Sequence, residues 1–237
     1  MKFKFNLLPL IVTTLLICLG MALGNWQSEK AQKKILLKKI FEEKKMLPPI
    51  LINATNIDSA FEEFRTVRIL GQFITSWPIY LDNRPLDGKP GFYLIMPFKV
   101  LNSDTYILVS RGWFQRNFND RNLMPEINVP KGIFKLEGRL KSSLGKVFQF
   151  GKQPDLKPGA VLQNLNINEF RKVSHYNVHT FFIEQTNFFD DSLIREWPSP
   201  SFGIDMHKGY AFQWYALVLL TFLFFLFTRF KNGSEKN

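Results

Sequence analysis

The sequence predicts a membrane protein in which two transmembrane helices flank an extracytoplasmic α+β domain with an antiparallel β-sheet or barrel. The chain of 237 residues is uncharged from Phe5 to Ser28 and again from Gly209 to Thr228. Each run has about the twenty residues that a helix needs to cross a bilayer. Between them, short runs rich in β-branched and aromatic residues alternate with turn sequences, which is the pattern of an antiparallel sheet.

The first apolar run predicts a transmembrane helix over residues 5–26. Lys2 and Lys4 precede the run and MALG resembles a cleavage site, so a signal peptide is the alternative. We expect an uncleaved anchor, because the run is longer than the core of a usual signal peptide. A second transmembrane helix is expected over residues 207–229, followed by a tail of residues 230–237.

Residues 27–47 are predicted to form a separate basic amphipathic helix. Strong helix formers fill this segment, Ser28 is a suitable N-cap, and Pro48 and Pro49 end the helix. Its lysines could contact lipid headgroups or nucleic acid, or simply be solvated. Nucleic acid is not expected as a partner, since no base-stacking motif accompanies the charge.

The β-rich domain is expected over residues 48–206. A short helix is predicted for INEFRKVS after Asn166, where the side chain can cap the first turn. Cys18, in the first apolar run, is the only cysteine of the chain, so the domain contains no disulfide. The predicted strands are TVRILGQFI, PIYL, GFYLIMPFKV, TYILVSRGWF, GIFKLEGRL and VHTFFIEQ.

Two spans place both termini on one side of the membrane and the domain on the other. Basic residues mark the termini as cytoplasmic: Lys2, Lys4, Arg229, Lys231 and Lys236. The lysines of residues 27–47 oppose this assignment, but long domains translocate largely regardless of charge. We therefore expect cytoplasmic termini and a periplasmic domain. No Arg-rich and Ser-rich leader precedes the first span, which favours a bacterial inner membrane over an organelle.

No catalytic motif is recognisable in the domain. The chain has no GxSxG, no HExxH and no phosphate-binding glycine loop, so we expect no enzymatic activity. His175 and His179 in HYNVH are the candidates for a metal site. On a strand, however, positions four apart are about 13 Å distant, and no cysteine or acidic cluster completes a site, so ordinary histidines are expected.

Two further patterns are candidate sites. Arg111, Gly112 and Trp113 emerge at the end of an apolar strand, where they could plug the barrel or form a docking patch for a partner; the structural role is favoured. In the second pattern, residues 207, 210, 211 and 214 follow the spacing of one helix face at the start of the second span. His207, Tyr210 and Trp214 could form an interfacial belt or hold a flat apolar ligand.

In order and spacing, several motifs resemble the surfeit locus protein 1 family: GNWQSEKAQKK, FRTVRILGQF, LDNRPLDGKPGFYLIMPF, ILVSRGWF, GIFKLEGRL and HKGYAFQWYAL. The resemblance covers nearly the whole chain, and RGW together with H-x-x-Y-A-x-Q-W is specific as a pair. It implies a non-enzymatic assembly factor for haem-copper cytochrome c oxidase of the aa3 type. Its implied partners are oxidase subunit I, to which haem a is delivered, and haem a synthase, together with membrane lipid.

The resemblance also implies roles for single residues. His207 would be an axial ligand of haem iron, held transiently, with Tyr210 and Trp214 beneath it, and Lys208 could pair with a propionate. The chain departs from the family pattern in two places: Lys30 replaces an arginine, and Asp205 and Met206 replace the asparagine often seen before the histidine. Two alternatives stay open, a scaffold that never binds haem and a membrane-anchored enzyme with an unrecognised site.

Overall fold

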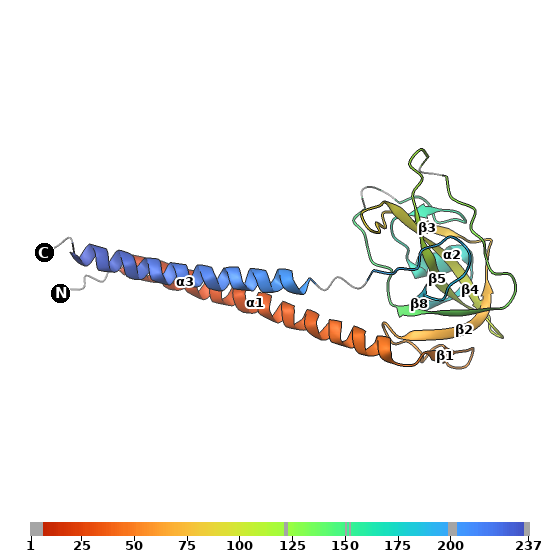
Figure 1. Cartoon of the computed structure of the whole chain (residues 1–237), viewed down its shortest axis with the longest axis horizontal. Coiled ribbons are helices and arrows are strands. Elements are labelled where there is room, and N and C mark those ends of the chain that lie inside the picture. Colours follow the sequence, from red (N-terminus) through yellow and green to blue (C-terminus); the bar gives the residue numbers. More distant parts are fainter. Residues whose placement is uncertain (1–6, 121–122, 150, 152, 199–202, 235–237) are drawn as a thin grey trace. The chain divides into compact units, whose positions relative to one another are not determined.

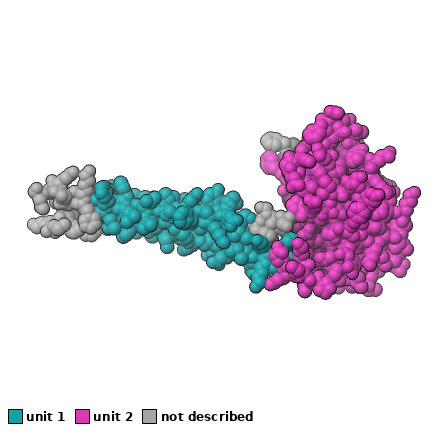
Figure 2. Space-filling view, viewed as in Figure 1, with its two compact units in different colours: residues 1–41, 200–237 teal, residues 42–199 magenta. Residues whose placement is uncertain are grey.

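The computed structural model describes residues 7–120, 123–149, 151, 153–198 and 203–234. Contacts divide the chain into two compact units, residues 1–41 with 200–237, and residues 42–199, which are coloured separately in Figure 2. The first unit consists of helix α3 (Ile204–Ser234) and most of helix α1 (Leu7–Met46). The second contains the strands, most of which Figure 1 labels together with the helices.

Helix α1 runs without a break from Leu7 to Met46, so the predicted first span and the predicted basic helix are one helix. The prediction that Ser28 caps a separate helix is wrong, because its hydroxyl donates to the Gly24 carbonyl within α1 at 3.0 Å. No proline lies between Pro9 and Pro48, so the backbone ladder continues where the sequence changes from apolar to basic. Both α1 and α3 are long and apolar enough to cross a membrane.

The apolar parts of α1 and α3 pack against each other through small residues. Gly20 and Gly24 are buried on α1 and have the GxxxG spacing that lets membrane helices approach closely. A Cβ at Gly24 would lie 2.6 Å from the Tyr215 ring, and one at Gly20 would lie 2.5 Å from the Val218 side chain. This close approach determines which residues of α1 lie beside which residues of α3.

Six strands lie where the sequence predicts them: β2 (Thr66–Phe73), β3 (Ile79–Leu81), β4 (Gly91–Val100), β5 (Thr105–Gln115), β6 (Phe134–Lys141) and β8 (Asn177–Gln185). The short strands β1 (Ile50–Ile52) and β7 (Val161–Leu162) are additional. Helix α2 (Ile167–Ser174) is confirmed, with the Asn166 side chain accepting from the Asn168 amide at 2.8 Å.

Strands β2, β6, β8, β5 and β4 close into a barrel, because β2 pairs with β4 as well as with β6. The β5–β8 pair is parallel, and the other four pairs of the barrel are antiparallel. The predicted sheet or barrel is therefore confirmed, with one parallel pair in it. Parallel neighbours need a long crossover connection, which the chain supplies through β6, β7 and α2.

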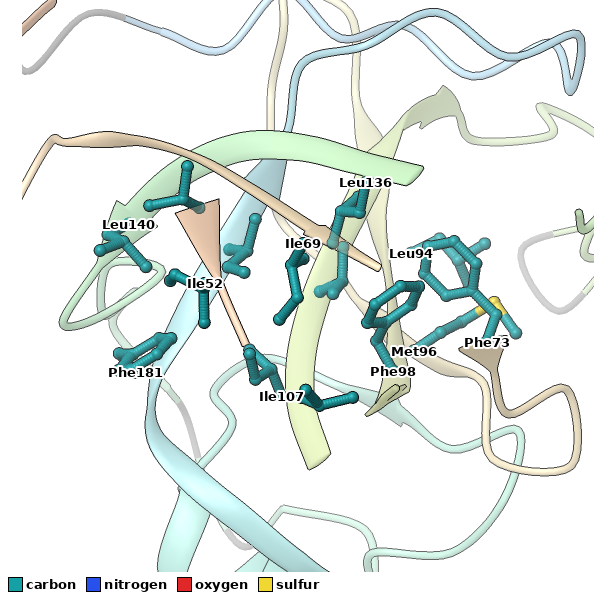
Figure 3. Close-up of a cluster of buried hydrophobic side chains, with 14 of the residues drawn as sticks. Ile52, Ile69, Phe73, Leu94, Met96, Phe98, Ile107, Leu136, Leu140 and Phe181 are labelled. Atoms are coloured by element: carbon teal, nitrogen blue, oxygen red, sulfur yellow. The ribbon is translucent and has the colours of Figure 1, made fainter. Parts of the chain in front are cut away.

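Hydrophobic side chains fill the barrel interior and also cover part of its outside. The interior cluster includes side chains from β1 and from all five barrel strands; Figure 3 shows part of it. A second cluster includes Leu108 and Phe182, which lie on the strands, and Phe170 of α2. Strands β4 and β5 are buried over most of their length, so the residues at their ends are held in a rigid frame.

Candidate functional site

His207 forms a hydrogen bond that determines which of its nitrogens can bind a metal. It lies in the first turn of α3, and its Nδ1 is 2.8 Å from Oε1 of Gln27 on α1. An amide oxygen only accepts, so Nδ1 must donate. In the neutral imidazole, Nε2 then keeps the lone pair that ligates a metal. Such an outer hydrogen bond also fixes the orientation of the ring.

The neighbours of His207 on α3 divide between two faces. Ala211 is 6% exposed and faces into the unit, where its small side chain leaves room for the close approach of α1. Trp214 is partly buried, whereas Tyr210 is 46% exposed. Lys208 is exposed beside His207. The helix therefore presents an imidazole, a cation and two aromatic rings within about two turns.

A second polar contact connects the two helices at nearly the same level of α1, through a residue about two turns further along α3. The Tyr215 hydroxyl donates to Oδ1 of Asn25 at 2.7 Å and lies 3.5 Å from the Ser28 hydroxyl. Polar side chains within apolar helices are stabilised by partners on the neighbouring helix. Together with the pair of Gln27 and His207, this contact fixes the register of α1 against α3.

Arg111 is fully buried in the β-barrel domain. Its Nη2 donates to Oδ2 of Asp191 at 2.6 Å and to the carbonyl of Asn128 at 3.0 Å, and its guanidinium lies 4.9 Å from the centre of the Phe73 ring. Asp191 also accepts from Arg195 Nη2 at 2.5 Å. Burial lowers the pKa of Arg111 to about 10, while the charge of Asp191 raises it, so the guanidinium is protonated at neutral pH.

Trp113 and Gly112 hold a segment that we call the C-terminal strap, residues 186–198. The backbone of Trp113 exchanges two hydrogen bonds with Ile194, at 2.7 and 2.8 Å, and its indole donates to the Arg84 carbonyl at 2.6 Å. A Cβ at Gly112 would lie 2.7 Å from the Leu193 Cβ. The three RGW residues thus all contact or support the strap.

The strap is held at its far end by Trp197. The Trp197 indole donates to the carbonyl of Gln185 at 2.6 Å, and its ring packs against Tyr93 at 5.1 Å between centroids. Because Arg111 and Trp113 are both buried, neither side chain is available to a partner in this structure. The geometry therefore favours the structural role over the docking role.

The two histidines of HYNVH belong to different elements and have different contacts. His175 is the C-cap of α2 in the left-handed conformation, with φ of 59°. His179 belongs to β8, and its Nε2 is 3.1 Å from Asp58 Oδ1. Among the described residues, no group of three or more His, Cys, Asp or Glu side chains could hold a metal.

The domain also has an open groove of about 610 Å³. Phe73, Leu94 and Met96 form its buried part, and Tyr80 and residues 127–132 form its walls. None of the residues that the sequence singles out as a site lines this groove. Arg111 nevertheless contacts three of its lining residues, Phe73, Met96 and Asn128.

Sequence reasoning missed the partners of both sites. Gln27 and Asp191 are separated by 180 and 80 residues from the side chains that they bind, and no local pattern connects such positions. For Asp191, the sequence contains one weak signal of its role. Asp191 and Arg195 have i, i+4 spacing within DDSLIREW, which indicates a charge pair but not its third member.

Comparison with known proteins gives one consistent family. A model of the SURF1 family matches residues 14–219, a range that includes His207 and the RGW residues. The chain is similar to a SURF1-like protein of Rickettsia prowazekii, with 29% identity over 244 residues that cover 99% of this chain and 92% of the relative.

Two further relatives match over shorter ranges. A SURF1-like protein of Rickettsia felis is 38% identical over 113 residues, which cover 47% of this chain and 46% of the relative. A SURF1-like protein of Rickettsia conorii is 29% identical over 182 residues, which cover 76% of this chain and 70% of the relative.

Proposed function

Because the chain belongs to the SURF1 family, we propose that it is a membrane-anchored assembly factor for haem-copper cytochrome c oxidase of the aa3 type. Its task would be to hold haem a for insertion into the catalytic subunit, subunit I. The chain would receive this cargo from the haem a synthase and would carry out no chemistry itself. The resemblance to the surfeit locus protein 1 family that the motifs indicate is thereby confirmed; the cargo and the partners are the proposal.

The hydrogen bond between His207 and Gln27 supports the proposal most directly. Neutral imidazole is a common protein ligand of haem iron, and the contact with Gln27 Oε1 keeps the lone pair on Nε2. The residues before His207 depart from the family pattern, which leaves the partner of the histidine open in the sequence. In the structure, Gln27 of the other helix is the partner.

The surrounding residues fit an amphipathic planar cargo. Tyr210 and Trp214 offer apolar ring surface within the span, and Lys208 offers a cation at its end. A porphyrin has an apolar plane that favours hydrocarbon and carboxylates that favour the headgroup region. His207 lies between these two environments, because it precedes the uncharged run that begins at Gly209. When bound, haem a supplies the redox centre of the oxidase, while this chain only binds and orients it.

The other two histidines of the chain, His175 and His179, belong to the domain. A single ligating side chain on the helix pair suits a cargo that must be released. The competing interpretation is a scaffold without haem, in which His207, Tyr210 and Trp214 form an interfacial belt. A test of whether the purified protein binds haem distinguishes haem ligation from the scaffold interpretation.

Haem retention is expected to depend on His207 and, to a smaller degree, on Gln27. The full chain is co-expressed with the enzymes of haem a synthesis and purified in mild detergent, and the haem absorption band is compared with protein yield. His207→Ala should lose the band at normal yield. Gln27→Leu should weaken haem affinity by about 10- to 100-fold, as loss of an outer hydrogen bond does at other metal sites.

His179→Ala is the matched control, since it removes a histidine that belongs to the domain and should leave the band unchanged. An unchanged spectrum in His207→Ala would exclude ligation and leave the interfacial belt. Loss of the band in all three variants would point to a general folding defect.

We further propose that the protein lies in a bacterial inner membrane with a periplasmic domain and cytoplasmic termini. Alkaline phosphatase is active only after export, so a fusion after Asn102 should be active and a fusion after Thr228 inactive. The physical reason is the excess of basic residues at the termini. Activity of the Thr228 fusion combined with inactivity of the Asn102 fusion would reverse the topology.

A further inference from the structure

Trp26 and three lysines share one face of α1 just beyond its apolar part. Positions 26, 30, 33 and 34 have the i, i+4, i+7 and i+8 spacing of a single helix face. Lys30 and Lys33 are exposed and Lys34 is partly buried. Trp26 is 50% exposed, and the Lys30 Nζ lies 5.7 Å from the centre of its ring. We call these four residues the basic face of α1.

The depth of the basic face is determined by the continuity of α1. Ser28 is the last residue of the uncharged run, and each further residue of a helix rises about 1.5 Å. Lys30, Lys33 and Lys34 therefore lie about 3, 8 and 9 Å beyond that run. The headgroup layer is about 5–8 Å thick on each side of the hydrocarbon, and lysine side chains can reach back toward it.

Among the described residues, neither Lys33 nor Lys34 forms an ion pair. Glu29 is the only acidic residue of α1 before Glu42; it lies four residues before Lys33 on the same side of the helix, but the described residues show no ion pair between them. Lys208 adds a further cation at this level, because its neighbour His207 contacts Gln27.

We propose that the basic face of α1 binds the headgroups of anionic phospholipids in the leaflet on the side of the domain. Lysine ammonium groups would pair with the phosphates, and Trp26 would lie among the glycerol and upper acyl groups, as tryptophans do at membrane interfaces. The lysines lie on the same side of the membrane as the domain, where basic residues are not expected from the positive-inside tendency. Lipid binding gives them a role there. The inference is carried by the residues of α1, with Lys208 as an additional charge, and it does not require haem binding.

Native mass spectrometry of the full chain in mild detergent tests the proposal. Dioctanoyl-phosphatidylglycerol and dioctanoyl-phosphatidylcholine are titrated separately, and the fractions of protein carrying each lipid are compared. We expect a clear preference for phosphatidylglycerol that decreases with salt, because the attraction is electrostatic. In Lys33→Gln/Lys34→Gln the affinity for phosphatidylglycerol should fall about tenfold, with phosphatidylcholine unchanged.

The control variant is Lys38→Gln/Lys45→Gln, which removes the same charge from α1 at about 15 and 25 Å beyond Ser28. It should keep the preference. Equal loss in both double variants would show a diffuse charge effect and overturn the assignment, as would a wild type without preference. Displacement of phosphatidylglycerol by millimolar inorganic phosphate would identify a site for free phosphate and overturn the lipid assignment.

Discussion

Replacing Asp191 by leucine is expected to destabilise the β-barrel domain by about 3–5 kcal/mol, because it leaves a buried guanidinium without its counter-charge. Arg111 is fully buried and Arg195 is 8% exposed at its side chain, and both donate to the same carboxylate oxygen. Arg195 can turn toward water when the carboxylate is removed. Arg111 cannot, since it is enclosed by Phe73, Met96 and the strap.

The measurement is urea unfolding of the full chain in mild detergent, followed by tryptophan fluorescence. A loss of this size is a large part of the 5–15 kcal/mol that is usual for a domain, so the transition should move to much lower urea. Asp190→Leu is the matched control. Asp190 is the exposed neighbour in the chain, and its replacement should change the unfolding free energy by less than about 0.5 kcal/mol.

A double variant tests whether the cost comes from the unpaired charge. Arg111→Met/Asp191→Leu removes the buried guanidinium together with the carboxylate, and apolar replacements of buried ion pairs are often neutral or stabilising. The double variant should therefore be more stable than Asp191→Leu alone. If it is less stable by the sum of the two single effects, packing rather than charge accounts for the loss.

Gly112→Glu is expected to prevent stable folding of the domain. A Cβ at this position would lie 2.7 Å from the Leu193 Cβ and 3.0 Å from the Ile194 carbonyl oxygen, so the strap must move away from β5. The carboxylate would also enter a buried site, at a cost of several kcal/mol. Protein level in the membrane and resistance to added protease should both fall sharply.

Gln115→Glu adds a carboxylate at the exposed end of the same strand and should be tolerated. Gly112→Ala should lie between the two, since it introduces the overlap without the charge and overpacking alone costs about 1–3 kcal/mol. Normal abundance of Gly112→Glu with lost oxidase activity would contradict the structural role and favour a docking role for the RGW residues.

Local signals in the sequence determine most of the elements but not their pairing. The run GFYLIMPFKV coincides with β4, and Asn166 marks the start of α2 because the cap is a contact within one turn. The pairing of β2 with β4 that closes the barrel and the parallel pair of β5 and β8 depend on segments far apart in the chain. Strands as short as β1 and β7 have too few residues to show a period.

The helix α1 shows why composition misplaces a boundary. Lysines replace apolar residues after Ser28, which changes the polarity of the helix surface but leaves its backbone hydrogen bonds intact. The candidate site shows the same limit. His207 could be selected from its place at the start of a span, whereas Gln27 becomes visible only when the two helices are placed side by side.

The 80 residues between Arg111 and Asp191 also govern when the domain can be completed during biosynthesis. At about 5–20 residues per second, the ribosome needs about 4–16 s to extend the chain from one to the other. During this interval the arginine has no counter-charge and must stay hydrated, so the end of β5 cannot yet be enclosed. A premature stop codon between β8 and Asp191 would extend that state indefinitely, and the truncated chain would be a substrate for quality-control proteases even with all eight strands synthesised.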